Sequence, residues 1–150
     1  MLAFHCDINV ILIEPFQSRH ECNRIAAYSR IMTCLQERVH AVDLQVLDNE
    51  ASVTYCRAIT QTWIKEFQLV PPDFHRCNTA ECAIQNFKAL FLAILADLDR
   101  AFPRSLWDTL LPQTEITLNL LRQATQAPII SAWEYYNGPM SYDATPFSPI

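Results

Sequence analysis

Short strand-like runs alternate with helical periodicity along most of this chain, and that alternation predicts a mixed α/β fold. The expected elements are strands at 2–6 and 9–16 joined by a turn at 7–9, a helix at 21–38, a strand at 43–48, a helix at 52–63, a strand at 67–70, a helix at 79–98 and a helical stretch at 106–124. Pro112 should break that last stretch. The final residues, 127–150, are rich in proline and should be mostly extended, with one helical turn at 132–136.

Gly138 is the one glycine of the chain. Phosphate-binding loops of the dinucleotide-binding and P-loop types need several glycines, so both classes are excluded. The length of 150 residues, with 51% hydrophobic and 18% charged residues, is typical of one packed domain. We assign 1–125 to a core domain and 126–150 to its proline-rich extension.

The charge and the cysteine content limit which partners the chain can bind and in which cellular compartment it is expected. The chain has 11 Lys and Arg against 16 Asp and Glu, and this net charge of −5 counts against strong nucleic-acid binding. Its six cysteines lack the spacing of a disulfide framework and are interpreted as reduced intracellular thiols. The apolar runs are too short to span a bilayer, and the first residues do not resemble a signal peptide, so no membrane association is expected.

Two carboxylates occupy positions suited to a site. Asp48 ends a predicted strand and Glu81 begins the predicted helix at 79–98. Ligands bind at the carboxyl edge of open α/β sheets, which favours a functional interpretation. An aspartate is also a common turn former and an acidic residue in a first helical turn complements the helix dipole, so each position alone has a structural explanation.

Five sequence strings, in order and with similar gaps, resemble the integrase core of retrotransposon polyproteins. They are Leu47–Glu50, Leu69–Pro72, Asn78–Lys88, Leu106–Pro112 with Thr117–Gln123, and Gly138 with Tyr142–Pro146. The resemblance implies a ribonuclease H-like mixed sheet flanked by helices. It also implies metal-dependent polynucleotidyl transfer, in which three acidic residues hold two Mg²⁺ or Mn²⁺ ions.

In that family pattern Asp48 matches the second acidic residue and Glu81 the third, so both are expected to be catalytic metal ligands that lie side by side. The first acidic residue belongs to a strand before the hairpin that this sequence does not contain. Asp7 is the nearest acidic residue, but it matches a hairpin position that points away from the metals. Without that strand, the second hairpin strand and the strand ending at Asp48 lose a shared neighbour, and an unpaired sheet edge is expected.

Gln85 and Lys88 follow Glu81 at helical spacing, and the resemblance suggests that they contact DNA together with Arg76. An ordinary solvated helix face explains the same spacing. His75, Cys77 and Cys82 supply only one arm of a zinc site, so zinc is not expected there.

The expected function is therefore DNA integration by an incomplete integrase core, inactive alone, with element and target DNA as partners and an intracellular or nuclear location. The alternative is an inactive retroelement remnant that binds nucleic acid or self-associates. A homodimer is compatible with both.

Overall fold

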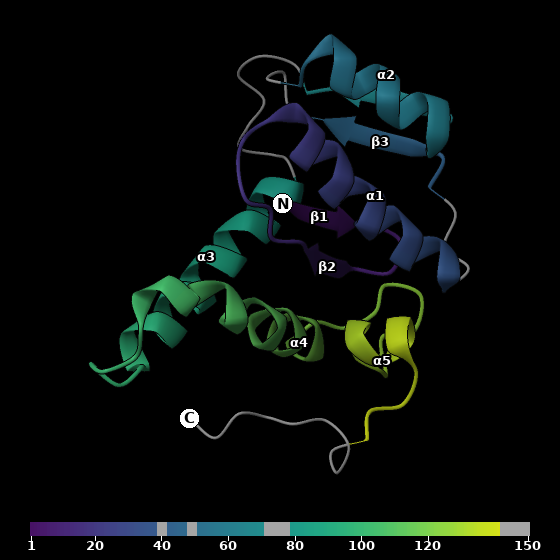
Figure 1. The fold of residues 1–150 in the computed structure, drawn as a ribbon. Coiled ribbons are helices and arrows are strands. Elements are labelled where there is room, and N and C mark those ends of the chain that lie inside the picture. Colours follow the sequence, from purple (N-terminus) through teal and green to yellow (C-terminus); the bar gives the residue numbers. More distant parts are fainter. Residues whose placement is uncertain (39–41, 48–50, 71–78, 142–150) are drawn as a thin grey trace. The chain divides into compact units, whose positions relative to one another are not determined.

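The computed structural model describes residues 1–38, 42–47, 51–70 and 79–141 (Figure 1). These residues form a mixed α/β structure, as the alternating pattern predicts. The elements are β1 (Leu2–His5), β2 (Val10–Ile13), α1 (Glu21–Glu37), β3 (Leu44–Leu47), α2 (Val53–Thr62), β4 (Glu66–Leu69), α3 (Thr79–Asp97), the 3₁₀ segment η2 (Arg104–Leu110), α4 (Leu111–Leu121) and α5 (Ala132–Asn137).

Within the described residues, the strands form two separate two-stranded sheets, and the single five-stranded sheet of a ribonuclease H-like fold is not present. β1 and β2 pair antiparallel, whereas β3 and β4 pair parallel. The chain correspondingly divides into two compact units. Unit 1 comprises Met1 and Glu14–Asn78, and unit 2 comprises Leu2–Ile13 and Thr79–Ile150.

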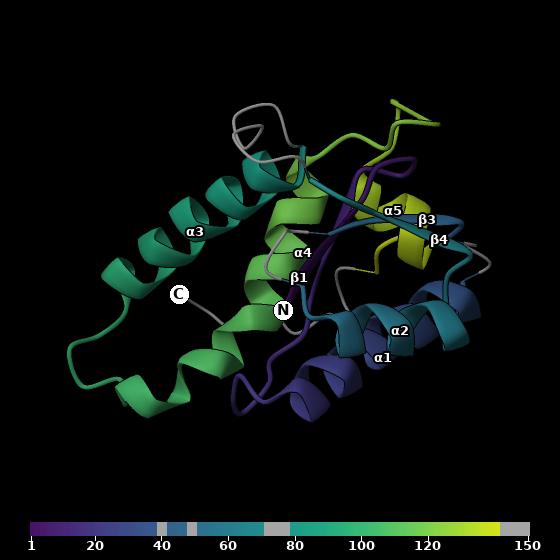
Figure 2. The same cartoon turned by 90° about the horizontal axis from the view of Figure 1, so that it is seen from above.

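Unit 1 packs α1 and α2 together and places α2 against β4 (Figure 2). Helix α1 contributes one buried face and α2 contributes a second. The buried side chains are Ala27, Tyr28, Ile31, Met32 and Leu35 from α1, and Tyr55, Cys56 and Ile59 from α2. Tyr28 and Tyr55 meet edge to face with ring centroids 5.9 Å apart. Burial raises the pKa of both phenols, that of Tyr55 to about 12.

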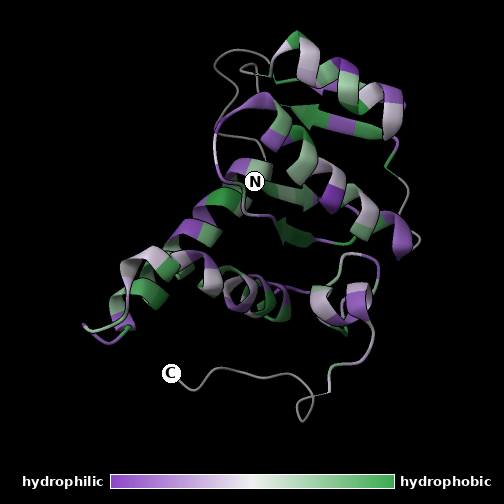
Figure 3. Cartoon of the chain, in the orientation of Figure 1, coloured by the Kyte–Doolittle hydropathy of each residue, from purple (hydrophilic) through white to green (hydrophobic). Residues whose placement is uncertain are grey.

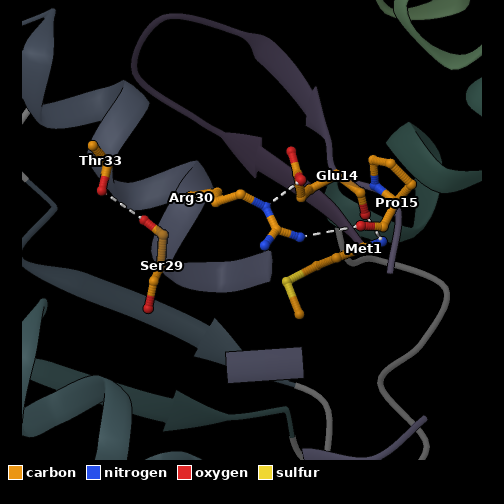
Figure 4. Close-up of polar contacts among 6 residues, drawn as sticks. All are labelled: Met1, Glu14, Pro15, Ser29, Arg30 and Thr33. Atoms are coloured by element: carbon orange, nitrogen blue, oxygen red, sulfur yellow. Dashed lines mark hydrogen bonds and ion pairs between the residues drawn. The ribbon is translucent and has the colours of Figure 1, made fainter. Parts of the chain in front are cut away.

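Polar contacts fix the entry into each helix of unit 1. The Arg30 guanidinium reaches back from α1 to the Glu14 carboxylate and donates to the Pro15 carbonyl at 3.3 Å (Figure 4). The Ser52 hydroxyl caps α2 by accepting a hydrogen bond from the Tyr55 amide at 3.1 Å. The chain between β2 and α1 is therefore held by charge as well as by packing.

Unit 2 is built on the β1–β2 hairpin, which packs against α3, α4 and α5 (Figure 1). β2 is hydrophobic throughout, and β1 is hydrophobic apart from His5 (Figure 3). The core centres on Ile11, Ala83 and Leu118, and the half-buried hydrophobic residues around it are Leu2, Phe4, Ile13, Phe87 and Leu90. α3 therefore reaches the core through the side that carries Ala83, Phe87 and Leu90.

The turn of the hairpin is held by hydrogen bonds to Arg122 and Gln123, which are distant in the sequence. Asn9 adopts the left-handed conformation, with φ of 62°. Its side-chain amide donates to the Gln123 carbonyl at 2.8 Å, and the Arg122 guanidinium donates to the Asn9 carbonyl at 3.1 Å. Arg122 also lies over the Phe4 ring, 5.2 Å from its centroid. The turn consequently takes its shape from tertiary contacts in addition to its own sequence.

Local signals place most helix and strand ends within a residue or two. Pro112 lies in the first turn of α4, and the chain before it is 3₁₀ rather than α-helical, so the expected break is present. The short turn expected at 132–136 is α5, which begins with a capping box between Ser131 and Glu134.

Candidate functional site

The amino-terminal half of α3 carries the candidate residues that the structure describes. Glu81 lies in the first turn and is half-buried, whereas Gln85 and Lys88 are exposed. At 100° per residue these three side chains fall on one stripe of the helix, opposite the side that meets the core through Ala83, Phe87 and Leu90. The exposure predicted for Gln85 and Lys88 is confirmed. Their expected contact with DNA stays a prediction.

Asp48 and Arg76 lie outside the described residues, as do His75 and Cys77. The expected closeness of Asp48 and Glu81 is therefore untested. Within the described residues, no group of three His, Cys, Asp or Glu side chains lies close enough to hold a metal ion. Glu81 is the only expected ligand that can be placed, and one carboxylate does not hold two ions. The described residues alone thus do not fit the two-metal centre.

The described residues do not support the other two ways of binding a metal, with Asp7 as a replacement ligand or with cysteines. Asp7 is exposed in the turn between β1 and β2. Cys82 is an exposed free thiol, and the other described cysteines, Cys6, Cys22, Cys34 and Cys56, are also free. Burial, with the nearby Asp7 charge as a smaller cause, raises the pKa of the Cys6 thiol, which therefore has less thiolate to offer a metal.

Much of α3 is left uncovered for so apolar a helix. Ala83 is its one buried residue, and Leu92 is 63% exposed. By length and composition alone, α3 is able to cross a membrane, a possibility that the short apolar runs of the sequence did not suggest. Core helices of soluble proteins pass the same test, and α3 packs against β1 and α4. The incomplete cover shows that the side of α3 away from the core lacks a partner within the described residues.

A hollow of about 670 Å³ lies at the other end of α3. It is lined by Leu95, Ala96, Leu98, Asp99, Arg100, Phe102 and Trp107. The helical rise of 1.5 Å per residue puts its first lining residue, Leu95, about 21 Å along α3 from Glu81. The hollow is therefore separate from the candidate carboxylate site.

The outer edge of β2 is closed by two side chains of α4, which the sequence did not point to. The Asn119 carboxamide accepts from the Ile11 amide at 2.8 Å and donates to the Ile11 carbonyl at 2.7 Å. The Glu115 carboxylate accepts from the Ile13 amide at 2.8 Å. Asn119 is fully buried, so its side chain takes the place of a neighbouring strand.

Among the described residues, no strand or side chain closes the outer edge of β1. Ile11 and Ile13 direct their backbone groups toward α4, so their register partners Phe4 and Leu2 must direct theirs toward the opposite edge. No partner for those groups occurs in the described part of the chain, where β1 pairs only with β2. An unpaired edge was expected at the second hairpin strand. It lies at the first, because α4 already covers the second.

Charge in unit 2 opposes polyanion binding. Its basic residues are Lys88, Arg100, Arg104 and Arg122, and its acidic residues are Asp7, Glu81, Asp97, Asp99, Asp108, Glu115, Glu134 and Asp143. The Arg122 guanidinium already contacts Asn9 and the Phe4 ring. Lys88 is the basic residue on the stripe of α3 that carries Glu81 and Gln85, so any DNA contact along that stripe depends heavily on Lys88.

No protein-family model matches the chain, and no curated protein is similar to it at a significant level. The resemblance to integrase cores therefore stays an expectation from the sequence strings.

Proposed function

We propose that this chain is part of an integrase-type polynucleotidyl transferase core, which cuts and joins DNA ends once a further strand with a central aspartate completes its sheet. In this proposal Asp48 and Glu81 are metal ligands and the added aspartate is the third. Gln85, Lys88 and Arg76 contact the DNA. Residues 1–150 alone are inactive.

The observation that carries the proposal is the pairing of the strands. A ribonuclease H-like sheet without its central strand would leave a hairpin on one side and the Asp48 strand with its neighbour on the other. An antiparallel β1–β2 pair and a separate parallel β3–β4 pair are what such a loss leaves. The open edge of β1 is an available position for the added strand.

The stripe on α3 gives weaker support. Glu81 at the first turn and exposed Gln85 and Lys88 leave room for a nucleic acid along that side of the helix. Mg²⁺ takes carboxylate oxygens and keeps several waters, so a half-buried Glu81 is a suitable ligand type. When bound, the two ions would activate the attacking oxygen and stabilise the leaving one. Glu81 would orient an ion there, and Lys88 would hold a DNA phosphate.

The decisive experiment compares residues 1–150 with a chain extended by a strand that carries a central aspartate. We expect Mg²⁺ and Mn²⁺ binding, measured by calorimetry, only in the extended chain. Strand transfer of a labelled DNA end should likewise appear only there. Replacing the added aspartate by asparagine should abolish activity and greatly weaken metal binding.

Matched variants of the extended chain separate the proposed ligands from charge in general. Asp48→Asn and Glu81→Gln should each abolish strand transfer, whereas Asp97→Asn, at the exposed far end of the same helix, should not. Strand transfer by residues 1–150 unaided would overturn the proposal. So would an extended chain that folds but binds Mg²⁺ equally well with and without Asp48 and Glu81.

One observation favours a second function. A hairpin with one capped and one open edge is suited to self-association, which would make the chain a non-catalytic self-associating module. DNA binding is not needed for this role. Strand transfer by the extended chain would argue against it as the main function.

A further inference from the structure

We propose that residues 1–150 form a symmetric dimer in which β1 of one copy pairs antiparallel with β1 of another, giving a four-stranded sheet in the order β2-β1-β1-β2. The inference uses no metal ligand and no DNA contact, so it does not rest on the catalytic proposal, although both proposals use the edge of β1. It follows from the asymmetry between the two edges of the hairpin.

The chemistry of the β1 edge selects a β-strand as its partner. The register places the amide and carbonyl groups of Leu2 and Phe4 on that edge. Buried or half-buried backbone groups need hydrogen-bond partners, and leaving them unpaired costs free energy. All residues of β1 are half-buried, and Leu2 and Phe4 pack against the core, so this edge borders an apolar surface. A neighbouring strand supplies donors and acceptors at the required spacing.

β1 is short, but its sequence lacks the residues that usually protect natural sheet edges. Leu-Ala-Phe-His contains no lysine, no proline and no bulge. β2, by contrast, is closed by Asn119 and Glu115. One edge of the same hairpin is thus blocked by dedicated side chains and the other is left available.

A second copy of this chain matches the edge because antiparallel pairing is self-complementary. With Leu2 opposite Phe4 of the other copy, four backbone hydrogen bonds form and the two side chains make an apolar cross-strand pair. Ala3 then faces its own equivalent across the symmetry axis, where a small side chain fits the close approach of a non-hydrogen-bonded pair.

The capped edge of β2 also sets the size of the assembly. A sheet with two open edges adds copies without limit, whereas one open edge per copy is used up in a closed dimer. We therefore expect a dimer rather than a fibre.

Sedimentation over a concentration series tests the inference directly. The chain should sediment with twice the 17.3 kDa mass of one copy. Ala3→Lys should give a monomer because two lysines would face each other, and Ala3→Asp should do the same. Mixing the two variants should restore a dimer, since the introduced lysine of one copy would then face the introduced aspartate of the other. This recovery also shows that both variants are folded.

Hydrogen exchange and a control variant locate the interface. The Leu2 and Phe4 amides should be protected in the dimer and exchange freely in the Ala3→Lys monomer, while the inward Ala3 and His5 amides stay protected in both. Leu92→Asp, on the exposed side of α3, should leave the dimer intact. A chain that is monomeric at every concentration would overturn the proposal. Dissociation by Leu92→Asp but not by Ala3→Lys would overturn it as well and assign association to α3.

Discussion

Replacing Asn119 by alanine tests how much unit 2 depends on the cap over β2. Asn119 is fully buried and makes two hydrogen bonds to the backbone of Ile11, which is itself fully buried. The variant leaves a buried amide and a buried carbonyl without their partner. At roughly 1–3 kcal/mol for each unsatisfied group, we expect a loss of about 3 kcal/mol in the free energy of unfolding.

Denaturant unfolding followed by tryptophan fluorescence measures this loss. Trp107 and Trp133 report on unit 2 and Trp63 on unit 1, so variants that keep one tryptophan at a time separate the two units. The transition of unit 2 should shift. Asn86→Ala, at an exposed position on α3, is the matched control and should change stability by less than about 0.5 kcal/mol.

An aspartate at position 119 sharpens the test. When protonated, its carboxyl group both donates and accepts, as the Asn119 amide does. When ionised, it opposes the Ile11 carbonyl with a buried negative charge. Burial raises the pKa of such a group, so Asn119→Asp should approach the parent protein in stability as pH falls and lose stability as pH rises. Equal losses for Asn119→Ala and Asn86→Ala, or an Asn119→Asp difference that does not depend on pH, would refute the reasoning.

Four further measurements address other contacts. Asn9→Ala should destabilise unit 2 by about 1–2 kcal/mol in denaturant, through the left-handed backbone and the lost bond to Gln123, and Asn9→Gly by less. Ser131→Ala removes the capping box of α5 and should cost about 1 kcal/mol by the same assay. Burial raises the pKa of Tyr55 to about 12, so the buried neutral phenol contributes to the free energy of unfolding. This contribution is fully present below about pH 10, the ordinary tyrosine pKa, and is lost as pH rises through about 12. Unit 1 should therefore lose stability across that range, and Tyr55→Phe should reduce the loss. In the extended chain, Lys88→Ala should lower the slope of log affinity for DNA against log salt by about 0.9, whereas an unchanged slope would remove Lys88 from the interface.

Periodicity and breakers predict the elements well because they act within a few residues. The apolar spacing of α3 and the proline at the start of α4 each determine local backbone conformation with little help from the rest of the chain. β4 begins one residue earlier than expected. β2 begins at Val10 because Asn9 is in the turn with positive φ, and it ends at Ile13, before Pro15.

The pairing of distant segments was not predictable in the same way. Asn119 and Glu115 are spaced i, i+4 on α4, and this shared face was the one available signal of a joint role. Only the fold brings them to Ile11 and Ile13, more than 100 residues earlier in the sequence. The unpaired edge was placed on the wrong strand for this reason.

The proposed integrase sheet and the proposed dimer require the same backbone atoms, and this competition links them. Leu2 and Phe4 each have one outward amide and one outward carbonyl, so an added strand and a second copy of β1 cannot both pair there. The extended chain, which carries the added aspartate strand, should therefore be a monomer that binds metal, whereas residues 1–150 should be a dimer that does not. A chain that gains metal binding while remaining a β1-paired dimer would place the added strand elsewhere. The edge of β1 thus decides which of the two functions the molecule can have.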